Sequence, residues 1–124
     1  MRVTLVGPCA SGKSVLARAL QDRGYDARQC SQEHSYVPDM WRRICKPDVL
    51  IYLDAGLATI RRRRQISWGL SYLQVLNDRL RDARAHSDLV IRTDDMTPDE
   101  ILQHVLRFLQ HLERPAASSE SNQG

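Results

Sequence analysis

Short apolar runs alternate with amphipathic segments along most of the chain. Residues 2–6 (RVTLV) are apolar and β-branched, which predicts a buried strand, and apolar positions at helical spacing then predict a helix over residues 15–23, ended by Gly24. Residues 48–54 (DVLIYLD) contain a continuous apolar run between two aspartates, which is typical of a parallel strand covered on both faces. Residues 89–91 (LVI) predict another short buried strand.

The segments between these runs predict further elements. Residues 25–30 alternate weakly and predict a strand, and Pro38 opens a short predicted helix, ended by Pro47, with Met40, Trp41, Ile44 and Cys45 on one face. A helix is expected over residues 57–64, followed by a loop over residues 65–71. The next predicted helix carries an apolar stripe formed by Leu73, Leu76, Leu80 and Ala83.

The last predicted helix has the clearest start. Thr97-Pro98-Asp99-Glu100 forms a capping box with proline at the first helical position, and the expected buried face comprises Ile101, Leu102, Val105, Phe108, Leu109 and Leu112. The resulting order of elements predicts an α/β fold: a three-layer α/β/α domain over residues 1–113, with a mostly parallel sheet of about four strands. Residues 114–124 are small and polar, and we expect them to be a disordered tail.

One motif lies where the first strand meets the first helix. Residues 7–14 read GPCASGKS, which fits the spacing of a phosphate-binding P-loop, or Walker A motif. Glycines at both ends allow backbone N–H groups to point at phosphate oxygens, and the helix adds its positive N-terminal end. The lysine is expected to reach the β- and γ-phosphates, and the serine hydroxyl suits Mg²⁺. The predicted phosphate contacts are Gly7, Pro8, Cys9, Ala10, Ser11, Gly12, Lys13, Ser14 and Val15.

Composition and charge narrow the classes of partner. The chain has 124 residues, of which 42% are hydrophobic and 27% charged, as expected for one soluble domain. No apolar run approaches the roughly 20 residues that cross a bilayer, and the start resembles a strand rather than a signal peptide, so we expect a cytoplasmic protein without a membrane partner. The three cysteines lack metal-type pairing and are expected to be reduced thiols. Residues 61–84 hold seven arginines against two aspartates, which favours an anionic ligand or solvent there.

Three segments in this order resemble one family: GPCASGKS, PDVLIYLDAGLATIRRRR and DLVIRTDDMTPDEILQHVLRFL. They look like P-loop kinases of the group that includes nucleoside monophosphate kinases, shikimate kinase and gluconate kinase, in an unusually short form. The resemblance implies a phosphotransferase that uses ATP and Mg²⁺ and passes the γ-phosphoryl group to a small-molecule or nucleotide acceptor. Such transfer is catalysed mainly by positioning and by countering charge on the transferring oxygens.

The resemblance also implies roles outside the P-loop. Arginines matching residues 61–64 would begin a mobile lid over residues 65–71. Because successive helical side chains are about 100° apart, only Arg61 and Arg64 are expected to share a face, and they are the predicted catalytic residues beside Lys13. The loop over residues 93–96 would lie near the adenine, which makes Asp94 a predicted nucleotide contact. Mg²⁺ would be held by Ser14 and, through water, by a carboxylate at a strand end.

The identity of that carboxylate depends on the strand beside residues 2–6. Members of this group are considerably longer, and the missing length lies between the first helix and Val49, where they have a further core strand and the acceptor-binding region. Asp54 follows an apolar run in the pattern of a Walker B motif and is the predicted metal carboxylate. If residues 25–30 form the neighbouring strand, Glu33 or Asp39 offers the acid instead.

Three functions remain open from the sequence. The first is an ATP-dependent kinase whose acceptor is held by residues 32–41 and the lid. The second is a nucleotide-binding switch or subunit without efficient transfer, because the acceptor region is short. The third is nucleic-acid binding through residues 61–84, although no nucleic-acid-binding motif accompanies those arginines and a nucleic-acid partner is not expected. Small size and the apolar face around Trp41 are also compatible with a homodimer.

Overall fold

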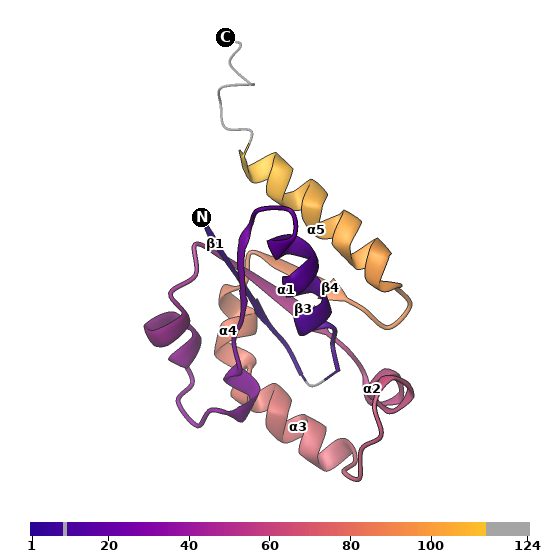
Figure 1. Ribbon diagram of the computed structural model, residues 1–124. Coiled ribbons are helices and arrows are strands. Elements are labelled where there is room, and N and C mark those ends of the chain that lie inside the picture. The colour runs from indigo at the N-terminus through magenta and orange to yellow at the C-terminus, as the bar shows by residue number, and fades with distance from the viewer. Residues whose placement is uncertain (9, 114–124) are drawn as a thin grey trace.

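A computed structural model describes residues 1–8 and 10–113 of the chain (Figure 1). Two sequence predictions, Cys9 as a phosphate contact and residues 114–124 as a disordered tail, fall outside the described residues. The elements in chain order are β1 (Arg2–Val6), α1 (Lys13–Gln21), β2 (Asp26–Gln29), the 3-10 turn η1 (Gln32–His34), the π-helical turn η2 (Trp41–Cys45), β3 (Val49–Asp54), α2 (Leu57–Arg63), α3 (Leu70–Arg79), α4 (Arg81–His86), β4 (Leu89–Arg92) and α5 (Pro98–Glu113).

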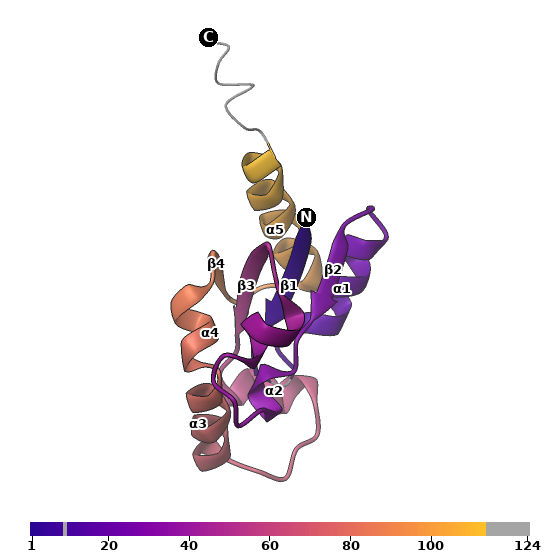
Figure 2. The ribbon, with the colours of Figure 1, turned by 90° about the vertical axis from the view of Figure 1, so that its left-hand side faces the viewer.

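The four strands in the described part of the chain form one parallel sheet in the order β2-β1-β3-β4, which is visible from edge to edge in Figure 2. Val3 of β1 is paired with Ala27 of β2 and with Val49 of β3, and Ile51 of β3 is paired with Leu89 of β4. Each parallel pair requires the chain to cross over the sheet between its strands. The predicted three-layer α/β/α fold with about four strands is confirmed.

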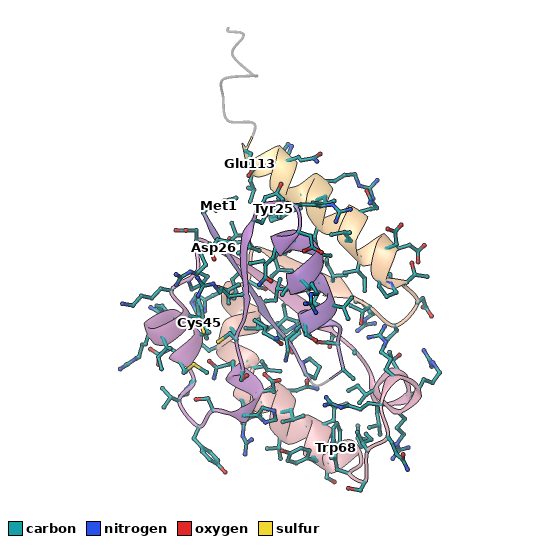
Figure 3. The ribbon with its side chains drawn as sticks, viewed as in Figure 1. Met1, Tyr25, Asp26, Cys45, Trp68 and Glu113 are labelled. Atoms are coloured by element: carbon teal, nitrogen blue, oxygen red, sulfur yellow. The ribbon has the colours of Figure 1, made fainter. Side chains whose placement is uncertain are left out.

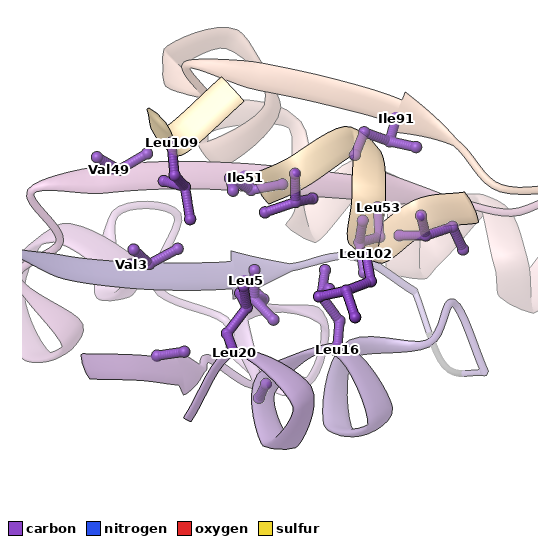
Figure 4. Packing of buried hydrophobic residues seen from close by; sticks show 14 residues of the cluster. Val3, Leu5, Leu16, Leu20, Val49, Ile51, Leu53, Ile91, Leu102 and Leu109 are labelled. Atoms are coloured by element: carbon purple, nitrogen blue, oxygen red, sulfur yellow. The ribbon is translucent and has the colours of Figure 1, made fainter. Parts of the chain in front are cut away.

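Alternate residues of β3 pack on opposite faces of the sheet, which explains its continuous apolar sequence. Val49, Ile51 and Leu53 belong to a core cluster shared with α1 and α5 (Figure 4). Leu50 and Tyr52 instead pack with Leu80 and with Ala83 of α4. Figure 1 shows the same division, with α1 and α5 on one side of the sheet and α4 on the other. Asp54 is an even-numbered position of this strand and therefore follows Tyr52 onto the α4 side.

Strand β2 lies directly beside β1. The sequence had left open whether residues 25–30 form the strand beside residues 2–6. Cys30 N–H, just beyond β2, continues the pairing by donating to Leu5 O at 2.9 Å. Since β1 leads into the P-loop and β2 leads into η1, the parallel register brings both turns to the carboxyl edge of the sheet. The short middle of the chain therefore supplies a carboxylate, Glu33, next to the P-loop.

The turn η2 differs from the predicted amphipathic helix. Trp41 is buried, with 6% of its surface exposed, whereas Ile44 is 70% exposed, so the two side chains do not share one apolar face. A π-helical turn has a wider hydrogen-bond ring than an α-helix, and the α-helical spacing on which the prediction relied does not apply to it. The apolar face on which the sequence-based suggestion of a homodimer relied is therefore not continuous in this segment.

The C-terminal helices follow the sequence pattern with two adjustments. The stripe from Leu73 to Ala83 is buried as predicted, but it is divided between α3 and α4, which meet at Leu80. The capping box of α5 is confirmed: Thr97 N–H donates to Glu100 Oε1 at 2.8 Å, and Glu100 N–H donates to Thr97 Oγ1 at 3.1 Å. Leu112 is 44% exposed rather than buried.

The far end of α5 is tied to the start of β2. Tyr25 Oη donates to Glu113 Oε1 at 3.3 Å, and both residues lie at the edge of the molecule near the N-terminus in Figure 3. Burial and the Glu113 carboxylate raise the pKa of the Tyr25 hydroxyl above its ordinary value. Over the described part of the chain, no helix has both the length and the apolarity required to cross a membrane.

Candidate functional site

The P-loop backbone requires glycine at two positions. Gly7 has φ +152°, and a Cβ placed there would lie 2.1 Å from Leu53 O of β3. Gly12 has φ +102° and is the N-cap residue of α1, with open space around it. Ala10 also has a positive φ, 59°, which a residue with a Cβ adopts rarely. The turn therefore packs tightly against β3 on one side and exposes the N-terminus of α1 on the other.

A cavity of about 610 Å³ opens at this turn. It lies at the carboxyl edge of the parallel sheet, between the P-loop, the segment after β2, the end of α2 and the start of α5. This is the place where open α/β sheets bind their ligands. Its lining residues are Ala10, Ser11, Gly12, Lys13, Ser14, Val15, Leu16, Gln29, Glu33, His34, Arg63, Arg64, Met96, Pro98 and Ile101.

Lys13 and Glu33 form a buried ion pair at the floor of the cavity. Lys13 Nζ donates to Glu33 Oε2 at 2.5 Å and to Gly7 O at 2.5 Å. Lys13 is 8% exposed and Glu33 is 4% exposed. Glu33 Oε1 is also buried, and none of the described residues donates a hydrogen bond to it. His34 Nε2 lies 3.8 Å from Glu33 Oε2.

The segment that carries Glu33 is held by a buried glutamine. Gln32 is fully buried; its Nε2 donates to Val37 O and Arg79 O, and its Oε1 accepts from Trp41 N–H at 2.8 Å. Arg79 Nη1 in turn donates to Glu33 O at 3.2 Å. These bonds join η1 to η2 and α3, so the backbone at Glu33 is held from both sides of the turn.

The arginines at the end of α2 are arranged differently from the prediction. Arg64 lines the cavity, but the other lining arginine is Arg63, and Arg61 lies near Gly69. The expectation for Arg61 and Arg64 relied on both being helical. Helix α2 ends at Arg63, and Arg64 has extended backbone, with φ −151° and ψ 139°, so spacing of three residues no longer places the pair on one face.

Arg63 links the P-loop to the loop before α5. Its Nη1 donates to Ala10 O at 2.9 Å, and its Nη2 donates to Thr93 O at 2.8 Å. Thr93 is itself buried and donates through Oγ1 to Asp54 O at 2.8 Å. Helical spacing in the sequence favoured Arg61 and Arg64 rather than Arg63, and no local signal in the run of four arginines distinguishes Arg63.

The loop predicted to form a lid packs against the body of the protein. Ile66 and Trp68 lie against a small core cluster of Ala55, Ile60 and Leu73. Trp68, labelled in Figure 3, also meets the ring of Tyr72 at 5.2 Å in an edge-on arrangement. In this structure the loop is therefore anchored by apolar contacts rather than extended into solvent.

Asp94, the predicted nucleotide contact, is hydrogen-bonded to the start of helix α2. Its Oδ1 accepts from Gly56 N–H at 2.9 Å and from Thr59 Oγ1 at 2.6 Å. These hydrogen bonds hold the pKa of the Asp94 carboxyl below its usual value, with the Thr59 bond as the largest cause. Met96 and Pro98, a few residues further on, line the cavity instead.

Asp54, the predicted metal carboxylate, is not among the residues that line the cavity. Its Oδ2 lies 3.4 Å from Arg84 Nη1 and 3.9 Å from Arg92 Nη2. Arg84 also lies over the ring of Tyr52, 5.1 Å from its centroid. The alternation of β3 thus directs the Asp54 side chain to the α4 side, where two arginines neutralise it.

The residues present fit a nucleoside triphosphate with Mg²⁺. A glycine cradle that a Cβ would fill, a lysine ammonium and the N-terminus of α1 suit a phosphate chain. The exposed Ser14 hydroxyl and the buried, unpartnered Glu33 Oε1 are hard oxygen donors of the kind that Mg²⁺ or its bound water prefers.

The sheet and the glycine turn together define a three-layer α/β/α domain with the P-loop fold, and comparison with known structures agrees. Shikimate kinase from Aquifex aeolicus superposes with a TM-score of 0.58 at 13% identity, over 93% of this chain and 99% of the other. Shikimate kinase from Bacteroides thetaiotaomicron superposes with a TM-score of 0.52 at 12% identity, over 91% and 98%. No protein-family model and no curated protein sequence matches the chain. The similarity is therefore one of fold.

Proposed function

We propose that this protein is a phosphotransferase that uses ATP and Mg²⁺ to phosphorylate a small acceptor. The observation that carries the proposal is Lys13, whose buried ammonium lies within 2.5 Å of Gly7 O and of Glu33 at the floor of a cavity of about 610 Å³. A lysine at the N-terminus of a helix, after a turn that admits only glycine at Gly7, suits β- and γ-phosphate oxygens. Arg64 at the rim would counter charge on the transferring group.

For the metal-side carboxylate, we propose Glu33 in preference to Asp54. Glu33 lines the cavity and has one buried oxygen that no described residue satisfies, whereas Asp54 is held by Arg84 and Arg92 on the α4 side. Ser14, exposed at the first turn of α1, would supply the hydroxyl ligand. When bound, Mg²⁺ would neutralise charge on the phosphate chain.

The acceptor is proposed to bind beside residues 35–38. A second cavity of about 630 Å³ lies between this segment and α3, and it begins two residues beyond Glu33. Arg79 lines it and lies over the ring of Tyr36, 4.6 Å from its centroid. A cation, an aromatic ring and the hydroxyls of Ser35 and Ser71 would suit a polar acceptor that carries a hydroxyl for phosphorylation.

Calorimetry tests the nucleotide part of the proposal. Titration of ATP with Mg²⁺ into the wild-type protein should give saturable binding, and Lys13→Met should weaken it by about a hundredfold or more, because charged contacts to phosphate are lost. Lys46→Met is the matched control, since Lys46 is the other lysine of the chain and precedes β3 at the opposite edge of the sheet. Equal affinities in all three proteins would contradict nucleotide binding at the P-loop.

Mass spectrometry tests the transfer. Wild-type protein with ATP and Mg²⁺ is incubated with hydroxy acids, sugars, nucleosides and nucleotides, and a product heavier by one phosphoryl group should form with one acceptor class. The same reaction with Lys13→Met should form none. Saturable ATP binding without any phosphorylated product would favour the alternative of a nucleotide-binding switch or subunit.

A further inference from the structure

The partners of Lys13 differ from those that nucleotide binding requires. Its ammonium donates to Glu33 Oε2 and to Gly7 O, both at 2.5 Å, so Glu33 and Gly7 supply two of its acceptors. We propose that Glu33 makes nucleotide binding depend on the divalent cation, so that the site discriminates between metal-bound and metal-free ATP. This inference rests on the proposed function, because it concerns the affinity of the P-loop for the same nucleotide.

If Lys13 moves to a phosphate chain, the Glu33 carboxylate loses its cationic partner. Glu33 is 4% exposed. Among the described residues, Lys13 is the only cationic side chain that lies closer than 3.8 Å to the Glu33 carboxylate. Removing one member of a buried ion pair is strongly unfavourable, because the remaining charge is neither solvated nor paired. A metal-free triphosphate would add to this cost, since its negative charge would enter the same cavity as the Glu33 carboxylate.

A divalent cation removes both penalties at once. It arrives with the phosphates and gives the Glu33 carboxylate a positive partner when Lys13 leaves. The unpartnered Oε1 of Glu33 is independent support, because a buried oxygen without a hydrogen-bond donor in the described part of the chain is suited to water bound to such a cation. The divalent cation would thus replace the Lys13 ammonium as the positive partner of Glu33, whereas metal-free ATP brings no such partner.

The geometry also limits what could replace the cation. His34 Nε2 is 3.8 Å from Glu33 Oε2, and Arg79 contacts the main-chain oxygen of Glu33 rather than its carboxylate. The Glu33 segment is fixed by the side chain of Gln32, whose two polar atoms contact Val37, Arg79 and Trp41. Because the turn is fixed in this way, the backbone of Glu33 cannot carry the carboxylate to solvent without breaking those bonds.

The test is the ratio of two dissociation constants, measured by calorimetry with the imido analogue of ATP in excess Mg²⁺ and in excess EDTA. We expect the wild-type protein to bind the metal-free analogue at least about tenfold more weakly than the metal-bound form. Glu33→Gln keeps the size of the side chain and removes its charge. It should bind the metal-free analogue about tenfold more tightly than wild type does, while binding of the metal-bound form stays level or weakens.

Asp39→Asn is the control for a general charge effect. It removes one negative charge from the same segment, and Asp39 pairs with Arg43 and does not line the cavity. Its ratio should equal that of wild type. Glu33→Gln can also be made in the Lys13→Met background, where the ion pair is already absent. There it should raise the affinity for the metal-free analogue by a smaller factor than it does in the wild-type protein.

The outcomes separate the two proposals. A ratio in Glu33→Gln equal to that of wild type, with binding intact, overturns the role of Glu33 and leaves nucleotide binding in place. Equal wild-type affinities in Mg²⁺ and in EDTA also overturn it, without any variant that needs to fold. Absence of wild-type binding under both conditions overturns the proposed function itself, and the inference with it.

Discussion

Replacing Gly7 by alanine perturbs the closest approach in the site. The new Cβ would lie 2.1 Å from Leu53 O and 3.0 Å from Ser11 Oγ, and Gly7 has φ +152°. The first neighbour is backbone in the middle of a parallel sheet, so it cannot rotate away as a side chain could. Either the P-loop moves away from β3 or the C-terminal end of β3 moves away from β1.

The magnitude follows from two contributions. Holding a residue with a Cβ in a sparsely populated backbone region costs about 1–3 kcal/mol. Forcing extra volume into a close-packed site costs typically about 1–3 kcal/mol. We therefore expect Gly7→Ala to lower the free energy of unfolding by about 3 kcal/mol or more, which is a large fraction of the stability of a small domain.

Urea unfolding at equilibrium, followed by circular dichroism, measures the change against two controls. Gly12→Ala and Gly24→Ala share a positive φ, 102° and 88°, but a Cβ at either position meets no heavy atom within 4 Å. These variants should lose only the conformational part, about 1–2 kcal/mol. A loss for Gly7→Ala no greater than that for Gly24→Ala would refute the steric argument.

Two further predictions concern residues around the cavity. Asp94→Asn should lower the free energy of unfolding by about 1 kcal/mol at neutral pH, because the carboxylate accepts hydrogen bonds from Gly56 N–H and Thr59 Oγ1. Since hydrogen bonds hold the pKa of Asp94 below 3.8, this contribution is present above that pH and is lost as the pH falls through the lowered value. A difference between wild type and variant that persists unchanged to about pH 2 in urea unfolding would contradict this. Arg63→Gln should weaken the binding of ATP with Mg²⁺, measured by calorimetry, about tenfold, because Arg63 joins Ala10 to Thr93. Arg62→Gln is the control and should leave the affinity unchanged, because the hydrogen bonds of Arg62 are long, at 3.3 and 3.4 Å.

Local sequence signals were sufficient for the strands, for the first and last helices and for the glycine spacing of the P-loop. Apolar residues at consecutive positions indicated that β3 is covered on both faces, and the structure packs them alternately against α1 with α5 and against α4. The capping box at Thr97 and Glu100 located the start of α5. Each of these features is determined by residues within a few positions of one another, so its physical cause is visible in the sequence.

The arrangement of charged side chains around the P-loop depended on tertiary structure. Alternate residues of β3 face opposite sides of the sheet, so the side on which Asp54 lies is decided by which residues of β3 pack against α1 with α5 and which against α4. Whether Arg61 or Arg63 reaches the cavity is decided by the residue at which α2 ends.

The pair of Lys13 with Glu33 shows the difference most clearly. The sequence alone determined that Lys13 follows a turn with the glycine spacing of a P-loop, because that spacing and the helix after it are local features. Only the parallel pairing of β2 with β1 brings Glu33, twenty residues further along, within 2.5 Å of the lysine. An ion pair is a contact in space between separate segments, and strand order, which is set by packing of the whole sheet, decides which segments meet.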